Sequence, residues 1–260
     1  MSSIDRRTLL GAAGLGMAAL ASGALAPPSG ASIREEVAAP DPDADAPPQH
    51  RIGFAVIGLD HYHIMSMTAA LIRGGGEPVF VFATNDAGLA PKQLADFRAQ
   101  FGEVPEARSI EEILDDPRVL VVAAAPVPDL RAALGIRVMR AGKDYLGDKP
   151  AITTLQQLAD VRAAIDATGR TFAIMYSERL EVPSAVKAGA LIRAGAIGRV
   201  LQTVNLAPHR ENAPARSPWF YEPEHTGGIL ADIGSHQADQ FLYYTGSTTA
   251  RVVAAQTGNL

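Results

Sequence analysis

Short apolar runs alternate with helical segments about six times between residues 51 and 176. The runs are almost continuously apolar, which is typical of parallel strands that are buried on both faces. The alternation favours an α/β fold with a Rossmann-type doubly wound parallel sheet over an all-β fold or a helix bundle. We predict strands at 51–57, 78–83, 119–125, 144–147 and 171–176, with helices at 63–73, 90–101 and 151–169 and another ending near residue 142.

The composition narrows the classes of function. The 260 residues are 47% hydrophobic, which is enough for a packed core. The net charge is −5 and the basic residues form no stripe, so we expect no nucleic acid partner. The chain has no cysteine, which excludes disulfides, thiolate metal sites and a cysteine nucleophile.

Residues 1–31 read as an export signal. Arg6 and Arg7 precede a run of small apolar residues at 9–25, and the pair resembles a twin-arginine signal. We therefore expect export, to the periplasm, with no membrane span after signal cleavage; an uncleaved anchor is the alternative. Residues 32–50 are rich in proline and acidic residues and are expected to form a disordered linker.

The first predicted strand ends at Gly58, and a helix begins near residue 63. A strand, a glycine turn and a helix open a dinucleotide-binding unit, in which the amino end of the helix faces a diphosphate. Asp60 and His63 stand where the second and third glycines of that fingerprint belong, so the motif is incomplete. We expect this turn to contact the cofactor through Gly58, Leu59, Asp60, His61 and His63.

His61 and His63 could also suggest a metal ion. The sequence supplies no partner cysteine and places no acidic ligand for them. A helix cap or a cofactor contact is the favoured interpretation, and we predict no metal site.

The ends of the other predicted strands supply further cofactor contacts. A carboxylate after the second strand usually holds the ribose of NAD, whereas an arginine suits the extra phosphate of NADP. Ala83 supplies neither, so the choice between NAD and NADP stays open. We expect contacts from Thr84, Asn85, Ala125 and Pro126.

Asp148, Lys149 and Pro150 follow the fourth predicted strand. Pro150 keeps Lys149 away from helical backbone angles, so the lysine is extended at the carboxyl end of a strand, where open parallel sheets bind ligands. We count Asp148 and Lys149 among the cofactor contacts; a solvated surface lysine is the alternative.

The pattern changes in the second half, residues 177–260. A helix at 183–194 precedes an alternating segment at 199–206, which predicts an antiparallel strand with one covered face, and a second strand is expected at 251–256. These segments predict an incomplete α+β domain with an open, largely antiparallel sheet. The loop at 207–226 mixes proline, aromatic and polar residues, which is common in loops that line sites and in loops that only cover a core.

A helix predicted at 229–245 has two different sides. Its apolar side, which we expect to pack, carries Leu230, Gly234, Ala238, Phe241 and Leu242. The opposite side carries a stripe of Asp232, His236, Asp239 and Tyr243. A solvated face is one interpretation, but a carboxylate one turn from an imidazole is also a usable acid–base pair.

Several motifs in this order resemble the Gfo/Idh/MocA family of oxidoreductases. They are residues 141–143 leading into 148–150, 176–179 followed by Pro183, 194–198 and 227–236. The family usually has Glu-Lys-Pro where this chain has Asp148, Lys149 and Pro150. The resemblance covers residues 51–260 and implies an NAD(P)-binding Rossmann domain at 51–176 and a partial substrate or oligomerisation domain at 177–260.

The resemblance implies hydride transfer between a sugar or polyol and NAD or NADP. Lys149 and Asp232 would orient the substrate hydroxyl, and His236 would remove its proton. Free nicotinamide cofactor is scarce outside the cytoplasm, so we expect the cofactor to be tightly bound. Substrate contacts are expected from Tyr176, His209, Arg210 and Trp219.

Members of this family usually continue through several more strands beyond the position of Leu260. We therefore expect a C-terminally truncated second domain, and a homo-oligomer if the sheet is completed. Two other functions stay open: an NAD-dependent glycosidase of the same family, and a non-catalytic nucleotide-binding protein.

Overall fold

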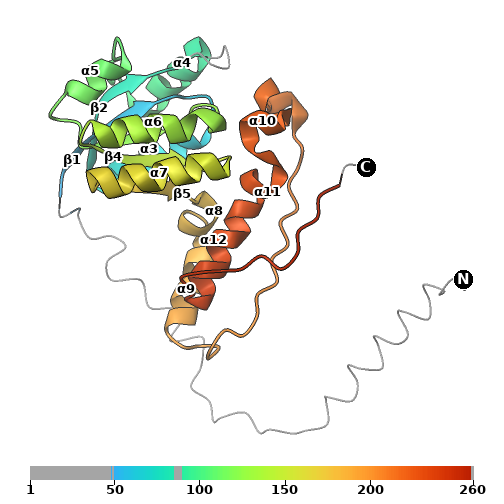
Figure 1. The fold of residues 1–260 in the computed structure, drawn as a ribbon. Coiled ribbons are helices and arrows are strands. Elements are labelled where there is room, and N and C mark those ends of the chain that lie inside the picture. Colours follow the sequence, from blue (N-terminus) through green and yellow to red (C-terminus); the bar gives the residue numbers. More distant parts are fainter. Residues whose placement is uncertain (1–47, 49, 85–89, 259–260) are drawn as a thin grey trace, which may run out of the picture. The chain divides into compact units, whose positions relative to one another are not determined.

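The computed structural model describes residues 48, 50–84 and 90–258 (Figure 1). The predicted export signal, most of the predicted linker and Asn85 lie outside these residues. The described residues belong to one compact unit, residues 46–260. The predicted domain boundary after residue 176 falls inside this unit and stays a prediction.

A five-stranded parallel sheet in the order β2-β1-β3-β4-β5 forms within the described residues, which confirms the predicted Rossmann-type sheet. After β2 the chain crosses to the other side of β1, so the sheet has a switch point between β1 and β3, where ligands bind in such folds. The strands are β1 Ile52–Ile57, β2 Gly76–Phe82, β3 Val121–Ala124, β4 Asp144–Asp148 and β5 Phe172–Met175.

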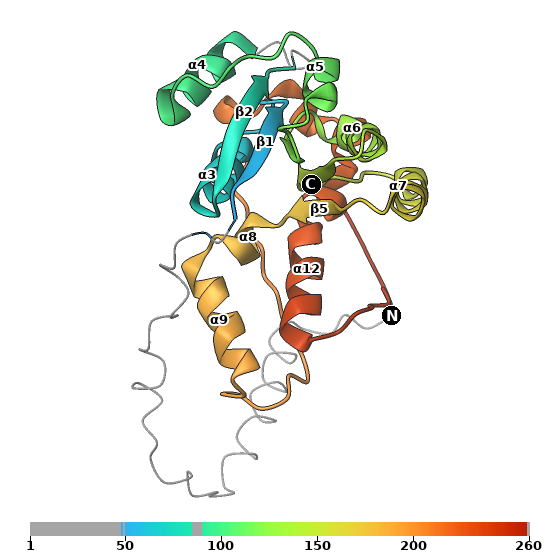
Figure 2. The ribbon, with the colours of Figure 1, turned by 90° about the vertical axis from the view of Figure 1, so that its left-hand side faces the viewer.

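Helices cover both faces of the sheet (Figures 1 and 2). One face carries α3 (His63–Arg73) and α4 (Ala90–Phe101), and the other carries α6 (Pro128–Arg140) and α7 (Leu155–Thr168). A short helix, α5 (Ile110–Asp115), precedes β3. The sheet is therefore doubly wound, as the alternating sequence predicts.

Successive residues of β1 enter opposite cores. Phe54 and Val56 pack in the cluster that includes α3 and α4, whereas Ala55 and Ile57 pack in the cluster that includes α5 and α6. All four side chains are at most 1% exposed. Burial of a large apolar side chain contributes roughly 1.5–3 kcal/mol, so both faces of the strand must be apolar.

Gly58 lets the end of β1 approach the loop after β3. Its φ is 75°, and a Cβ atom at this position would lie 2.6 Å from the backbone nitrogen of Pro126. Only glycine combines this backbone conformation with so close an approach. The two loops therefore meet directly across the switch point.

We expect Gly58→Ala to destabilise the protein by about 1–3 kcal/mol and to weaken nucleotide binding, because the methyl group must push the two loops apart. Denaturant unfolding and calorimetric titration with NAD measure the two effects. Gly142→Ala is the matched control, since Gly142 has φ 80° with nothing within 4 Å of its Cβ position. Equal effects of the two substitutions would contradict the steric explanation.

The second half consists of helices and connecting segments in the described residues. Among the described residues, no helix combines the length and apolar character needed to cross a bilayer. The helices are α8 Ser177–Leu180, α9 Pro183–Arg193, α10 Pro223–Thr226, α11 Gly228–Asp232 and α12 Gly234–Thr245, with short 3-10 turns at Ala213–Ala215 and Pro218–Tyr221.

The strands predicted at 199–206 and 251–256 do not form in the described residues. Apolar side chains in both segments are exposed, for example Leu206 and Val253 at 87% each. A segment of alternating apolar and polar residues forms a strand only when a neighbouring strand pairs with it. No described strand pairs with either segment. The predicted antiparallel sheet is accordingly not part of the described structure.

The helix predicted at 229–245 is divided at Ile233 into α11 and α12, and its orientation differs from the prediction. Leu230 and Ala238, predicted to pack, are exposed. Asp232 and His236, on the polar side, are buried at 6% and 2% exposure. The polar side faces inward because Lys149, after β4, pairs with Asp232, and Arg179, on α8, pairs with Asp239.

Candidate active site

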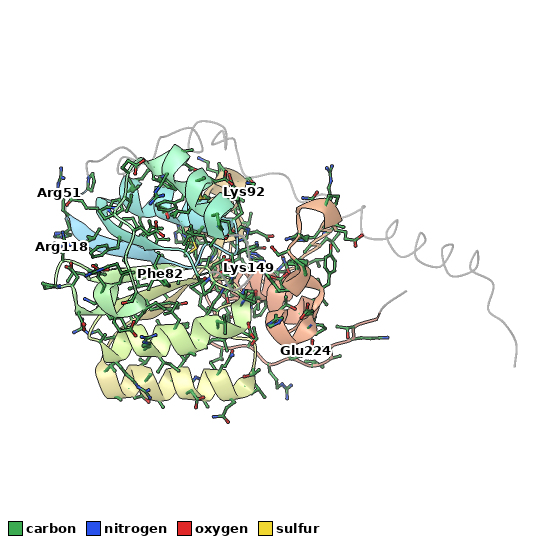
Figure 3. All side chains as sticks on the ribbon, turned by 90° about the horizontal axis from the view of Figure 1, so that it is seen from above. Arg51, Phe82, Lys92, Arg118, Lys149 and Glu224 are labelled. Carbon is green, nitrogen blue, oxygen red and sulfur yellow. The ribbon has the colours of Figure 1, made fainter. Side chains whose placement is uncertain are left out.

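The loops that follow β1, β3 and β4 meet at the carboxyl edge of the sheet. Figure 3 shows Lys149 at this edge, beside the helices of the second half, with Arg51 and Arg118 at the opposite edge. In an open parallel sheet, this carboxyl edge is where a site is expected.

Asp148 is the centre of a buried hydrogen-bonded cluster. Its Oδ2 atom lies 2.5 Å from Nδ1 of His61, and its Oδ1 atom lies 3.0 Å from Nδ1 of His63. Arg131, which is 0% exposed, places Nη2 3.2 Å from Oδ2. Burial alone would raise the pKa of Asp148, but Arg131 and the two histidines hold it well below its usual value.

Arg131 also fixes the backbone around Lys149. Its guanidinium donates to the carbonyl oxygens of Pro126, Asp148, Lys149 and Pro150. The peptide bond between Lys149 and Pro150 is cis. One buried cation therefore holds both the loop after β3 and the loop after β4.

His61 is neutral at neutral pH. Burial lowers the pKa of its imidazole to about 4, although Asp148 acts in the opposite direction. Its ring also stacks edge-on against the rings of His63, at 4.1 Å, and Trp219, at 6.0 Å. The neutral imidazole of His61 is thus held in place and lines the site.

The donor atoms of His61, His63 and Asp148 lie within 4.8 Å of one another, a spacing that could suit a metal ion. Asp148 thus provides the acidic partner that the sequence did not place beside the histidines. Arg131 already brings positive charge next to this carboxylate. Each further positive charge about 4 Å from a guanidinium costs about 4 kcal/mol at an effective dielectric constant of about 20, so we assign the cluster to hydrogen bonding.

Lys149 and Asp232 form a buried ion pair between the sheet and α11. The lysine Nζ atom donates to Oδ1 of Asp232 at 2.8 Å and to its carbonyl oxygen at 3.3 Å. The two side chains are 5% and 9% exposed. The pair orients the ammonium group and leaves it next to the cavity described below.

His236 is a buried base. Burial lowers the pKa of its imidazole and the Lys149 ammonium lowers it further, so the ring is neutral at neutral pH. Its Nε2 atom lies 3.8 Å from Oε1 of Glu178, and its Nδ1 atom has no hydrogen-bond partner within the described residues. The ring of Tyr176 packs 5.9 Å from it.

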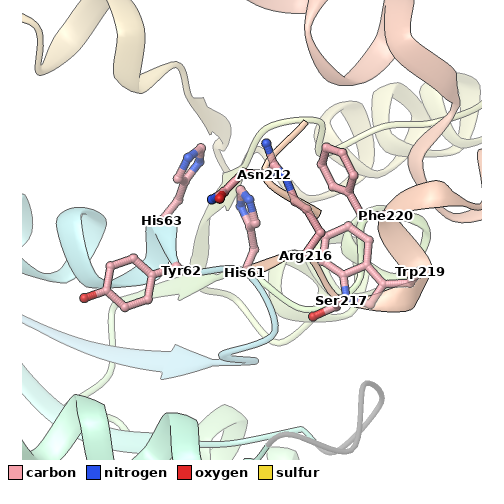
Figure 4. Close-up of a pocket in the computed structure, with 8 residues that line it drawn as sticks. All are labelled: His61, Tyr62, His63, Asn212, Arg216, Ser217, Trp219 and Phe220. Atoms are coloured by element: carbon pink, nitrogen blue, oxygen red, sulfur yellow. The ribbon is translucent and has the colours of Figure 1, made fainter. Parts of the chain in front are cut away.

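Two neighbouring cavities lie beside these groups. The inner cavity, of about 100 Å³, is lined by His61, His63, Lys149, Ser177, Glu178, His209, Arg216, Ile233 and His236. The aromatic cavity, of about 440 Å³, is lined by His61, Tyr62, His63, Asn212, Arg216, Ser217, Trp219 and Phe220 (Figure 4). Both histidines and Arg216 line both cavities, so the two cavities are adjacent.

A third cavity, apolar and of about 300 Å³, lies across the switch point. It is lined by Thr84, Ile110, Pro126, Leu130, Ala133, Leu134 and Arg137. Its size and apolar walls suit an adenine ring. The amino end of α3, next along the crevice, has no side-chain cap, which suits the negative charge of a diphosphate. The crevice therefore fits a nicotinamide dinucleotide.

Asp60 lies beside Thr84, which lines the apolar cavity. It is 4% exposed and its Oδ2 atom accepts a hydrogen bond from Oγ1 of Thr84 at 2.7 Å. A carboxylate is thus available beside the end of β2, although it comes from the turn after β1.

The predicted site residues divide into three groups. Gly58, Asp60, Thr84 and Pro126 line the crevice or its loops, whereas Leu59 and Ala125 are buried in the hydrophobic core. Lys149, His209 and His236 line the inner cavity, and Trp219 lines the aromatic cavity. Arg210 is exposed and lines none of the three cavities.

The sequence did not identify Arg131, Glu178 or Arg216. Arg131 lies in a helix whose periodicity gives no reason to bury a cation. Glu178 belongs to the motif at 176–179, which offered a signal that we did not use. Arg216 packs its guanidinium 3.9 Å from the ring centre of Phe220, and that contact is only visible in the folded loop.

The fold and the crevice define a Rossmann-type nucleotide-binding protein. The family described as "Oxidoreductase family, NAD-binding Rossmann fold" matches residues 52–176, and the "GFO/IDH/MocA C-terminal domain" matches residues 185–260. The chain belongs to the Gfo/Idh/MocA family of oxidoreductases.

Curated relatives include a 1,5-anhydro-D-fructose reductase of Ensifer adhaerens, 28% identical over 71% of this chain and 54% of that protein. A D-xylose dehydrogenase of Paenarthrobacter nicotinovorans is 27% identical over 49% of this chain and 34% of that protein. The chain spans about half the length of the first relative and about a third of the second.

Solved structures of related fold include one of Erwinia carotovora atroseptica described as an oxidoreductase. It has a TM-score of 0.75 and 46% identity, covering 81% of this chain and 61% of that chain. A levoglucosan dehydrogenase in complex with NADH has a TM-score of 0.59 and 22% identity, covering 76% of this chain and 54% of that chain. At that identity the second likeness concerns the fold alone.

Proposed function

We propose that the protein is an exported, NAD-dependent oxidoreductase that acts on the CH–OH group of a sugar or polyol. The observation that carries the proposal is that a buried lysine, held by Asp232, and a neutral buried histidine line the same inner cavity. An ammonium and an imidazole on one small cavity suit removal of a hydroxyl proton.

In this mechanism, Nε2 of His236 accepts the proton of the substrate hydroxyl. The Lys149 ammonium stabilises the negative charge that develops on the same oxygen, and Asp232 holds that ammonium in place. His61 and Trp219 wall the site and exclude water. The bound nicotinamide supplies the hydride acceptor.

Asp60 supports NAD over NADP. Its carboxylate, hydrogen-bonded to Thr84 at the end of β2, suits a ribose with free hydroxyls and would repel a 2′-phosphate. Within the family, the relatives named above act on sugars or sugar derivatives by name, which supports a substrate of that class.

The twin-arginine-like start supports export, and an exported enzyme must carry its cofactor with it. We therefore propose that NAD is retained through purification. The aromatic cavity, which shares His61 and His63 with the inner cavity, gives the substrate a place beside the reacting groups.

The test starts with purified protein. Denaturation followed by mass analysis is expected to release NAD, and sugars or polyols are expected to reduce it, as followed by NADH absorbance. Protein that contains no nucleotide and binds none would oppose the proposal. Cleavage of a glycoside without net cofactor reduction would instead support the NAD-dependent glycosidase.

A further inference from the structure

His236 must lose the proton that it accepts before the next turnover, and its side chain is only 2% exposed. This requirement follows from the proposed function. The ring therefore needs a neighbour that passes the proton to water. Glu178, on α8, is the acidic side chain that faces its Nε2 atom, at 3.8 Å.

Glu178 contacts a second histidine on its other side. The same Oε1 atom lies 3.2 Å from Nε2 of His209, which belongs to the loop at 199–212. The side chains of Glu178 and His209 are 31% and 36% exposed. Solvent exposure therefore increases from His236 through Glu178 to His209.

Glu178 and His209 also separate two cavities. Both line the inner cavity, and both line a polar outer cavity of about 400 Å³. The outer cavity is otherwise lined by residues of the loop and of α12, most of them exposed: Val204, Asn205, Leu206, Ala207, Pro208, Gln237 and Gln240. The pair forms a wall between the reacting groups and water.

The contacts of His209 leave a place for one proton between this histidine and Glu178. Its Nδ1 atom lies 3.1 Å from the carbonyl oxygen of Ala207, which only accepts, so Nδ1 carries a hydrogen. The Nε2 atom, 3.2 Å from a carboxylate oxygen of Glu178, then carries a lone pair. One additional proton, on Nε2 or on Glu178, would be shared between these two atoms as a hydrogen bond.

We propose that Glu178 and His209 form the exit route for the proton released in each turnover. The substrate hydroxyl gives its proton to Nε2 of His236. Glu178 accepts that proton as the shared proton passes to Nε2 of His209, and the imidazolium releases it to water in the outer cavity. These proton steps move no electrons: the electron pair of the substrate C–H bond would leave as the hydride that the nicotinamide accepts, and each proton accepted is matched by one released.

The charges around His236 favour release toward Glu178. The groups that act on its ring are Lys149, Glu178, His63 and Asp148. Lys149 and His63 oppose the imidazolium, whereas the two carboxylates favour it. Asp148 is already bonded to Arg131, His61 and His63, so Glu178 is the carboxylate that can receive the proton.

The test compares His209→Ala and Glu178→Gln with the control Gln240→Ala, which lines the outer cavity but does not titrate. We expect His209→Ala to lower kcat roughly 10- to 100-fold with KM little changed, and added imidazole to restore it. The first turnover, measured by rapid mixing, should keep its wild-type rate because His236 can still accept one proton.

Exchange of the His236 ring proton with water, followed by NMR, gives a second readout that needs no turnover. We expect slower exchange in His209→Ala and in Glu178→Gln. The exchange rate in Gln240→Ala should equal that of the wild type. If the wild type is active and His209→Ala keeps both the wild-type kcat and the wild-type exchange rate, the proposed exit route is wrong. A wild type without hydride transfer would overturn the proposed function instead.

Discussion

Lys149→Met is expected to abolish measurable turnover and to destabilise the protein by about 3–5 kcal/mol. The lysine and Asp232 are 5% and 9% exposed, so removing the ammonium leaves a buried carboxylate without its counter-charge. Turnover is lost because the charge that develops on the substrate oxygen loses its stabilising cation. Urea unfolding and the rate of NADH formation measure the two effects.

The double variant Lys149→Met with Asp232→Leu separates stability from catalysis. Replacing both members of a buried ion pair by apolar residues is often neutral for stability, so we expect most of the lost free energy of unfolding to return. Turnover should stay absent. Lys92→Met serves as a control, since its side chain is 77% exposed and its pair with Asp96 lies on the surface. A double variant as unstable as the single one would mean that the pair is not the source of the effect.

His236→Ala is expected to lower kcat by about 10²- to 10⁴-fold while nucleotide binding stays unchanged. The imidazole is the proton acceptor in the proposed mechanism, and it lines the inner cavity, away from the apolar cavity that suits adenine. Steady-state kinetics and calorimetric titration with NAD measure the two quantities. His50→Asn, at an exposed histidine, is the control.

The pH profile gives a second check on His236. A base acts in its neutral form, so kcat should rise with pH through the pKa of this ring and then level off. Burial and Lys149 lower that pKa below the usual 6.5, so the rise should lie on the acid side of 6.5. Since Glu178 raises the pKa, Glu178→Gln should move the rise to still lower pH. Turnover that is unchanged in His236→Ala would mean that this ring is not the proton acceptor, whereas nucleotide binding without turnover in the wild type would support the non-catalytic alternative.

The sheet was predictable because its signals are local. The helices predicted at 63–73 and 90–101 match α3 and α4, since their boundaries are marked by nearby turn residues. Ser109 caps α5, with its hydroxyl accepting from the backbone N–H of Glu112. Caps, glycines and apolar runs act within a few residues, so the sequence displays them directly.

The candidate site was predictable only in part, because its contacts are distant in sequence. Asp148 meets His61 and His63 across 87 and 85 residues, and Lys149 meets Asp232 across 83. Helical periodicity placed the apolar side of α11 and α12 inward, since periodicity alone cannot show that a buried cation is available elsewhere. Motif resemblance identified Lys149, Asp232 and His236, but it gave no information on Arg131.

Because α11 and α12 are separated at Ile233, the carboxylate of Asp232 and the imidazole of His236 are held by different helices. Asp232 is anchored to the sheet through Lys149, whereas His236 is carried by the helix that follows. A substitution that loosens α12 alone would therefore displace the imidazole of His236 while the ion pair of Lys149 and Asp232 keeps its geometry.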